Sequence, residues 1–240
     1  SQLTVYCREC WWSDKWNPLD YARDYNPNQP FFEQWDKFIR TIPQMNLIDM
    51  NSENSAYTNC VSHNKNSYLI FTADYNENSL YSNWLQHSRD CCDNLKLNNS
   101  ERAYECFFGD RLHSSQYLIK CFSATECLYC YDCRNIQNCF LSSNLRNKQY
   151  YILNKPYSRE EYEKIVAEWQ LDTPAGRDKA LTALKELMGQ SIHHYRNQLG
   201  RIEQSSGDYL RDVNQAWECF DLEQADHCRY VRNMIKVKDA

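Results

Sequence analysis

Residues 66–94 read NSYLIFTADYNENSLYSNWLQHSRDCCDN, and short apolar patches return within them at a nearly constant interval. Asn, Ser and Asp separate the patches, and the same frame continues on both sides of this stretch. The marker residues step by 11, 12, 12, 12, 13, 10, 12 and 12 positions; they are Tyr57, Tyr68, Leu80, Cys92, Tyr104, Tyr117, Cys127, Cys139 and Tyr151. A repeat this short cannot bury a core of its own, so the pattern predicts a stacked array.

The length of the repeat points to short strands. A strand of about four to six residues plus a turn fills a period of about 12 residues. We therefore expect a mainly β chain with a β-solenoid over residues 54–157, built either from one patch per compact coil or from two patches per coil of about 24 residues. Small side chains would fill a narrow interior, and Asn amides would bond the backbone at the corners. The alternative is a β-sandwich with evenly spaced strands.

Helices are predicted on both sides of the array. Phe31, Trp35 and Ile42 recur at helical spacing behind Pro30, and Pro43 would end that helix, which lies in a helix-and-linker region over residues 29–53. The sequence Ser158-Arg159-Glu160-Glu161 matches a capping box, and Thr173-Pro174 suits the start of a second helix. A helical insertion is therefore expected over residues 158–200. The repeat then resumes at Tyr209, Cys219 and Cys228, so residues 201–240 are expected to form returning coils and a cap.

Composition excludes some classes of protein. The chain has 240 residues, with 27 basic and 32 acidic side chains and a net charge of −5. That acidic balance argues against a whole-surface nucleic-acid binder. No apolar run approaches the roughly 20 residues of a membrane-spanning helix, so we expect no membrane partner. The 13 cysteines are an odd number and no export signal is visible, which favours reduced thiols in a cytoplasmic protein.

The motif Cys7-x-x-Cys10 has the spacing of a zinc knuckle. Two thiolates on a tight turn reach one tetrahedral ion, and a structural site needs two further ligands. Residues 1–28 are accordingly expected to be a partial, zinc-ribbon-like segment with half of a zinc site. The alternative is a pair of buried thiols beside Trp11 and Trp12.

A second cysteine motif lies inside the array. Cys127, Cys130, Cys133 and Cys139 have a spacing that resembles iron–sulfur ligation. However, Cys127 and Cys139 are also one repeat apart, and strand alternation would send residues three apart to opposite faces. We therefore expect a structural ladder of thiols, with a metal site at these four residues as the alternative.

Basic and aromatic residues alternate near the end of the array. Arg146, Lys148 and Lys155 flank Tyr150 and Tyr151. This combination can hold single-stranded nucleic acid through phosphate contacts and base stacking. The alternative is a solvated edge that discourages aggregation.

Three phrases are distinctive. They are residues 6–16 (YCRECWWSDKW), residues 51–55 (NSENS) and residues 144–158, which contain NLRNKQYY and NKPYS. They resemble a family of uncharacterised, largely metagenomic bacterial proteins that is common in candidate-phyla genomes. The resemblance covers nearly the whole chain. It implies a zinc-ribbon-like N-terminus before a Cys- and Asn-rich repeat region, with Cys7 and Cys10 as the second knuckle of a ribbon whose first knuckle precedes Ser1. It implies no activity.

The sequence contains no complete catalytic constellation. Our leading hypothesis is a non-catalytic binding or scaffold protein that presents a rigid surface to a protein partner, with Trp84, Trp169 and Trp217 as aromatic anchors. A homodimer is a further expectation. One rival is a zinc-ribbon-linked module that binds single-stranded nucleic acid. The other is a metal- or thiol-dependent enzyme, which would require a bound metal or a reactive thiol of low pKa.

Overall fold

The computed structural model describes residues 3–194, 198–223 and 232–235. The chain divides into two compact units, Ser1–Gln190 and Ser191–Ala240. About 40% of it is strand and 20% is helix, and the long sheets are parallel. The prediction of a mainly β chain with additional helices is confirmed.

The N-terminal segment is small and irregular. It contains β1 (Val5–Tyr6), α1 (Arg8–Trp11), the 3-10 helix η1 (Pro18–Tyr21), α2 (Phe31–Ile39) and β2 (Gln44–Met45), and β1 pairs with β2 in parallel. Helix α2 starts behind Pro30 as expected but ends at Ile39, before Ile42. Pro43 disfavours helical geometry in the residue before it, and the N–H of Thr41 closes a tight turn on the carbonyl of Phe38 at 2.9 Å.

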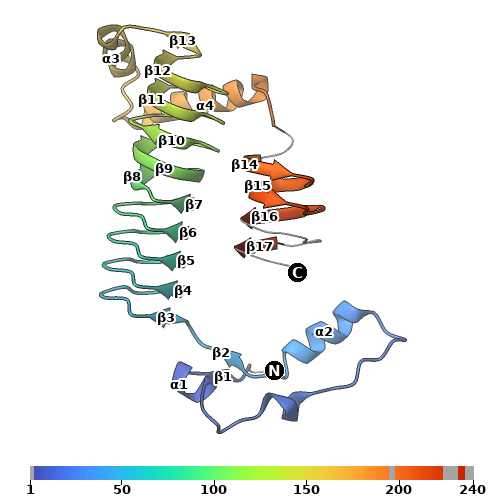
Figure 1. Cartoon of the computed structure of the whole chain (residues 1–240). Coiled ribbons are helices and arrows are strands. Elements are labelled where there is room, and N and C mark those ends of the chain that lie inside the picture. Colours follow the sequence, from blue (N-terminus) through green and yellow to red (C-terminus); the bar gives the residue numbers. More distant parts are fainter. Residues whose placement is uncertain (1–2, 195–197, 224–231, 236–240) are drawn as a thin grey trace. The chain divides into compact units, whose positions relative to one another are not determined.

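The main body is a stack of parallel strands (Figure 1). Each residue pairs with the residue 12 positions later, as in Asn59↔Phe71, Phe71↔Asn83 and Phe122↔Arg134. One coil therefore takes 12 residues, which decides between the two coil lengths left open by the sequence. The strands are β3 (Asp49–Met50), β4 (Asn59–Ser62), β5 (Phe71–Asp74), β6 (Asn83–Gln86), β7 (Leu95–Asn98), β8 (Glu101–Tyr104), β9 (Phe107–Gln116), β10 (Phe122–Thr125), β11 (Arg134–Phe140) and β12 (Arg146–Ile152).

The register of the stack is more regular than the marker residues suggested. Ala56 pairs with Tyr68, so Tyr57 lies one position beyond the true partner. Cys92 pairs with Tyr104, and Gln116 rather than Tyr117 follows them in the same column. The steps of 11, 13 and 10 thus came from markers taken in neighbouring columns. Pairing also starts at Asp49, five residues before the expected boundary at residue 54.

A three-residue period builds each coil. From Asn51 to Leu153 every third residue has a positive φ of 44–58°. This left-handed conformation turns the chain, so a 12-residue coil has four short sides. The residue after each turn points into the stack and is buried, as for Ser67, Ile70 and Ala73. Every third residue of the stack therefore points into the interior.

Interior polar side chains complete the backbone hydrogen bonding. The N–H of Ser79 donates to the hydroxyl of Ser67 at 3.3 Å, and the N–H of Ser88 donates to Oδ1 of Asn76 at 2.9 Å. The hydroxyl of Ser79 in turn donates to the carbonyl of Glu77 at 3.0 Å. A buried N–H without an acceptor is costly. Asn and Ser occupy the interior because they accept the N–H of the coil above.

Replacing Thr72 by Asn should stabilise the protein by about 1 kcal/mol. Thr72 is exposed and β-branched, and its φ is 52°. The left-handed region is strained for such a residue and tolerated by Asn. Urea unfolding measures the change. Thr125 lies in β10 outside this region, so Thr125→Asn should give no stabilisation; equal gains for both variants would contradict the explanation.

Two helices follow the stack within the first unit. The hairpin strand β13 (Lys155–Pro156) pairs antiparallel with β12. Helix α3 (Arg159–Glu168) opens with the predicted capping box, because Glu161 N–H donates to the Ser158 hydroxyl and Ser158 N–H to the Glu161 carboxylate. Helix α4 (Pro174–Gln190) starts where Thr173 accepts the N–H of Gly176, and it continues through Gly189.

The second unit is another parallel sheet. Its strands are β14 (Gln198–Glu203), β15 (Gly207–Asn214), β16 (Cys219–Glu223) and β17 (Arg232–Ile235). Leu210 pairs with Leu222, so the 12-residue register returns after the helices. The sheet begins at Gln198, inside the range 158–200 that was expected to be helical. Cys228, the last expected repeat position, lies outside the described residues.

Candidate binding face

Large hydrophobic side chains are exposed mainly on one side of the stack. Within residues 51–152 of the described chain, all but Tyr75 occupy three neighbouring columns, which contain positions 68, 57 and 71 and their 12-residue repeats. We call this surface the tyrosine face; it consists of Tyr57, Tyr68, Phe71, Leu80, Tyr81 and Tyr104. The exposed fractions of these side chains run from 36% to 69%. Because contiguous exposed apolar side chains are a common feature of interaction sites, the tyrosine face is our candidate binding surface.

The rings of the tyrosine face are ordered by contacts with one another. Tyr68 meets Tyr57 edge-to-face at 5.5 Å between ring centroids and Tyr81 at 5.8 Å. Tyr104 makes the same kind of contact with Tyr117 at 5.5 Å. Edge-to-face pairs fix the ring orientations. The face is therefore a pre-arranged surface and not a set of independent side chains.

In the later coils the chain covers the same columns with its own helices. Phe140 lies in the column of Tyr104, is fully buried, and meets the indole of Trp169 at 5.1 Å. Tyr129, in the column of Tyr57, is 1% exposed and stacks on Tyr117 at 4.5 Å. Residues of α3 and α4 pack against this cluster. The tyrosine face is thus the uncovered part of one continuous surface.

Two carboxylates interrupt the tyrosine face. Asp93 and Glu105 occupy the column between Tyr81 and Tyr117, on successive coils. Burial and the charge of Asp93 raise the pKa of Glu105. The thiol of Cys92 donates to Asp93 at 3.3 Å, and burial together with this hydrogen bond raises the pKa of Cys92 to about 11. These two acidic groups therefore lie close together in partly apolar surroundings.

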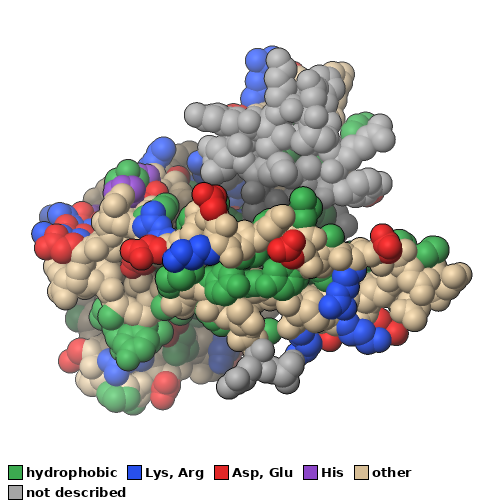
Figure 2. Space-filling view, turned by 90° about the horizontal axis from the view of Figure 1, so that it is seen from below, with side chains coloured by type: hydrophobic (Ala, Val, Ile, Leu, Met, Phe, Trp, Pro, Cys, Tyr) green, Lys and Arg blue, Asp and Glu red, His purple; other side chains and the backbone are tan. Residues whose placement is uncertain are grey.

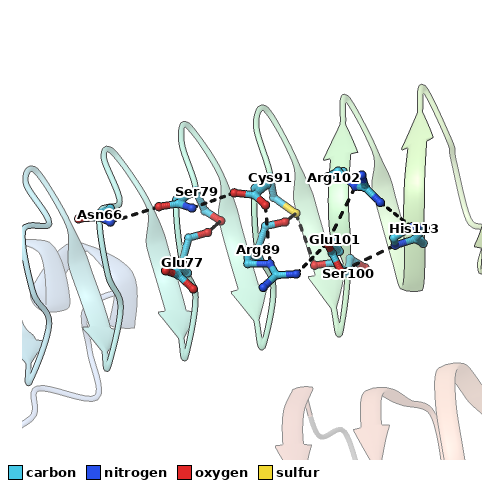
Figure 3. Close-up of polar contacts among 11 residues, drawn as sticks. Asn66, Glu77, Ser79, Arg89, Cys91, Ser100, Glu101, Arg102 and His113 are labelled. Atoms are coloured by element: carbon cyan, nitrogen blue, oxygen red, sulfur yellow. Dashed lines mark hydrogen bonds and ion pairs between the residues drawn. The ribbon is translucent and has the colours of Figure 1, made fainter.

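A different side of the stack carries polar columns that are paired internally (Figure 3). Asn66 donates to Asn78 at 3.2 Å, one coil further on. Arg89 bonds Glu101 at 2.8 Å, and Arg102 contacts His113 at 2.8 Å. Exposed pairs of this kind contribute little stability. These polar side chains pair with one another along the stack, whereas the side chains of the tyrosine face expose apolar surface to solvent.

The N-terminal cysteine pair is exposed, so the alternative of two buried thiols is wrong. Cys7 Sγ accepts the backbone N–H of Cys10 at 3.4 Å. This hydrogen bond lowers the pKa of Cys7, whereas hydrogen bonding to Cys7 raises the pKa of Cys10. In the described parts of the chain no three His, Cys, Asp or Glu side chains are grouped to hold a metal ion. Zinc at this pair stays a prediction.

Aromatic side chains cluster in the N-terminal segment that carries this pair. Trp11 and Trp16 lie 4.8 Å apart, and with Tyr21 and Phe38 they help to line a hollow of about 460 Å³. Figure 2 shows hydrophobic side chains gathered on the side of the molecule that carries this segment. Helix α2 adds an exposed Phe32 to the same segment.

The four cysteines of the array all point into the stack. Cys127, Cys130, Cys133 and Cys139 are each 0% exposed. The expectation that residues three apart face opposite ways is wrong, because a left-handed residue between them turns the chain. Their thiols donate to backbone carbonyls, as Cys130 does to Leu128 at 3.3 Å. Burial raises the pKa of Cys127 and Cys130 well above the ordinary value.

Thiol labelling should separate these cysteines. In the native protein Cys7, Cys10 and Cys60 are exposed and should react with iodoacetamide, with Cys7 ahead of Cys10 at neutral pH because its lowered pKa gives more thiolate. The interior thiols should react only after unfolding in denaturant. Mass spectrometry of peptides measures each site. Fast labelling of Cys130 in the folded protein would contradict this assignment.

The basic and aromatic residues near the end of the stack do not form a free strip. Arg146 bonds Asp132 at 3.0 Å, and Lys148 lies 5.6 Å from the ring of Tyr151. Tyr150 packs against Tyr162 of α3, and Tyr151 packs against the stack interior. Lys155 is exposed in β13. Both tyrosine rings are thus engaged within the chain.

The three tryptophans singled out from the sequence lie in separate places. Trp84 is half-buried under Lys96, whose amine is 4.9 Å from the ring centroid. Trp169 packs against Phe140 and under Lys179. Trp217, in the second unit, is 62% exposed. Sequence reasoning missed the tyrosine face, although Tyr68, Leu80 and Tyr104 were among its repeat markers.

No family model and no curated protein matches this chain. Among solved structures, one similarity is to the UDP-N-acetylglucosamine O-acyltransferase of Moraxella catarrhalis RH4, with 14% identity over 61% of this chain and 82% of that one. The TM-score is 0.22, which carries no argument about function. In the described residues, no helix is both long and apolar enough to cross a membrane.

Proposed function

We propose that the chain is a non-catalytic binding protein, a β-solenoid whose tyrosine face docks a protein partner. One observation carries this proposal. The face continues into columns that the chain itself covers with helices, where Phe140 and Tyr129 are buried, while Tyr57, Tyr68 and Tyr81 remain exposed. Aromatic side chains of the same columns are thus covered by helices at one end of the stack and exposed to solvent at the other.

The physical properties of the face suit protein recognition. Tyrosines bury large areas at a small cost in conformational entropy, and aromatic residues dominate interface hot spots. The stack holds them at fixed spacing, because each coil is hydrogen-bonded to the next. The ring contacts among Tyr57, Tyr68 and Tyr81 add further order. Preorganisation of this kind favours affinity.

The interior thiols favour this proposal over a thiol-dependent enzyme. A catalytic thiol needs a lowered pKa and access to substrate. Burial raises the pKa of Cys91 to about 11 and that of Cys106 to about 12. Hydrogen bonding to Cys121 and Cys130 lowers the pKa of Cys133 to about 4, but its side chain is fully buried. The side chains of Cys91 and Cys106 are inside the stack as well, so none of these three thiols is accessible to a substrate.

Site-specific photo-cross-linking tests the proposal. A benzoylphenylalanine at position 81 samples the tyrosine face, and one at position 87 samples another side of the same coil. Both positions are exposed and have a positive φ, 49° for Tyr81 and 47° for His87, so they form a matched pair. We expect a protein adduct from position 81 in cells that express the full chain, and loss of the adduct when Tyr68→Asp is added.

The outcome against the proposal is equally definite. Equal adducts from positions 81 and 87, or none from position 81, would remove the tyrosine face as the binding surface. Circular dichroism of each variant shows whether the stack is intact. If the adduct contains a second copy of this chain, the partner is that second copy and the tyrosine face is a homodimer interface.

A further inference from the structure

The covered part of the surface shows which kind of element it accepts. Helix α4 presents Ala180 and Leu184, both buried, to the cluster that contains Tyr129 and Phe140. The same helix carries Arg177. Burial raises the pKa of Tyr129 to about 12, and the positive charge of Arg177 opposes that rise. The cover that this chain uses is therefore a helix with a buried apolar side, which places the charges of Arg177 and Asp178 near the tyrosine column.

The uncovered part of the surface carries two carboxylates that have no basic partner within the described residues. Asp93 and Glu105 lie between Tyr81 and Tyr117 in one column, and no basic side chain in the described residues forms an ion pair with either carboxylate. Their backbones are about 4.8 Å apart because they lie on successive coils. One ammonium or guanidinium group can contact both carboxylates and a neighbouring tyrosine ring together.

We propose that the uncovered tyrosine face binds an amphipathic helix of a partner protein, with a Lys or Arg of that helix seated between Asp93 and Glu105. This rests on the proposed function and specifies its partner. The apolar side of the helix covers Tyr68, Leu80 and Tyr81, as α4 covers the later coils. The cation neutralises two carboxylates that are otherwise crowded in partly apolar surroundings.

The probe for this proposal is a fluorescein-labelled peptide of residues 173–190, TPAGRDKALTALKELMGQ, which combines an apolar stripe with Arg177. Fluorescence anisotropy with the full chain measures its affinity. We expect saturable binding that weakens about tenfold when Asp93→Asn and Glu105→Gln are combined, since one charge-pair interaction of ordinary strength is worth about that factor. The control variant combines Glu77→Gln and Asp90→Asn, acidic residues of the polar columns, and should bind as the wild type does.

A double-mutant cycle makes the contact specific. Arg177→Ala in the peptide should cost the same factor against the wild-type chain and almost nothing against the Asp93→Asn, Glu105→Gln chain. Tyr81→Asp should remove binding altogether.

Three results would overturn the inference. They are absence of saturable binding, an affinity that does not depend on Asp93 and Glu105, and a dependence on Phe140 but not on Tyr81, which would mean that the peptide replaces α4. If the adduct at position 81 persists in any of these cases, the proposed function stands and only the choice of a basic helix fails.

Discussion

Replacing Asn76 by Leu should lower the free energy of unfolding by about 4 kcal/mol. Asn76 is buried, and its amide donates to Asn64 Oδ1 at 2.9 Å and to the carbonyl of Leu85 at 2.8 Å. Its own Oδ1 accepts the N–H of Ser88 at 2.9 Å. Leucine has nearly the same shape but leaves the Leu85 carbonyl and the Ser88 N–H buried without these partners, and each such group costs about 1–3 kcal/mol.

Asn78 provides the control for this prediction. It lies two residues away, also links neighbouring coils, and is exposed. Asn78→Gly keeps the left-handed conformation and should cost less than about 1 kcal/mol. Urea unfolding of both variants measures the difference. Similar losses at the two sites would mean that the interior asparagine is no more important than the surface one.

Replacing Phe140 by Ala should also cost about 4 kcal/mol, because it removes a fully buried ring and leaves a cavity. Phe140 contacts Tyr129 on the stack and Trp169 at the end of α3. Its loss should therefore loosen the helices as well as destabilise the stack. We expect the thermal midpoint to fall and hydrogen exchange in α3 and α4 to accelerate.

Phe71 is the matched residue on the uncovered part of the same surface. It is 38% exposed, so Phe71→Ala should change stability by less than about 1 kcal/mol. Its effect should instead appear as a weaker adduct from position 81. A large stability loss at Phe71 together with a small loss at Phe140 would reverse the assignment of covered and uncovered parts.

Local rules in the sequence were sufficient for several elements. The capping box at Ser158 and Glu161 predicted the start of α3, because its two hydrogen bonds involve only neighbouring residues. Pro30 correctly predicted the start of α2. The end of α2 was harder to predict. It depends on the restriction that Pro43 places on the preceding residue and on the tight turn that Thr41 closes on Phe38. The repeat predicted short strands and a period near 12 residues.

The strict register and the three-residue period were harder to recognise. Ser67, Asn76, Ser79 and Ser88 lie at multiples of three from one another, a pattern present in the sequence but weaker to the eye than the apolar markers. Strand alternation suggested the wrong direction for Cys130. The left-handed residue between each inward pair changes that geometry, and such a conformation is unusual for residues other than glycine.

A mainly β chain with a repeat near 12 residues and a helical segment after it could be predicted from local patterns, because periodicity and capping involve residues close in sequence. Which columns lie inside the stack, and which part of the aromatic surface stays exposed, depends on contacts between residues far apart in sequence. Tyr81 and Tyr117 lie in the same column, yet Tyr81 is exposed and Tyr117 packs in a cluster with residues of α3 and α4. That difference depends on where α3 and α4 return to the stack, which is a long-range contact that no local pattern encodes.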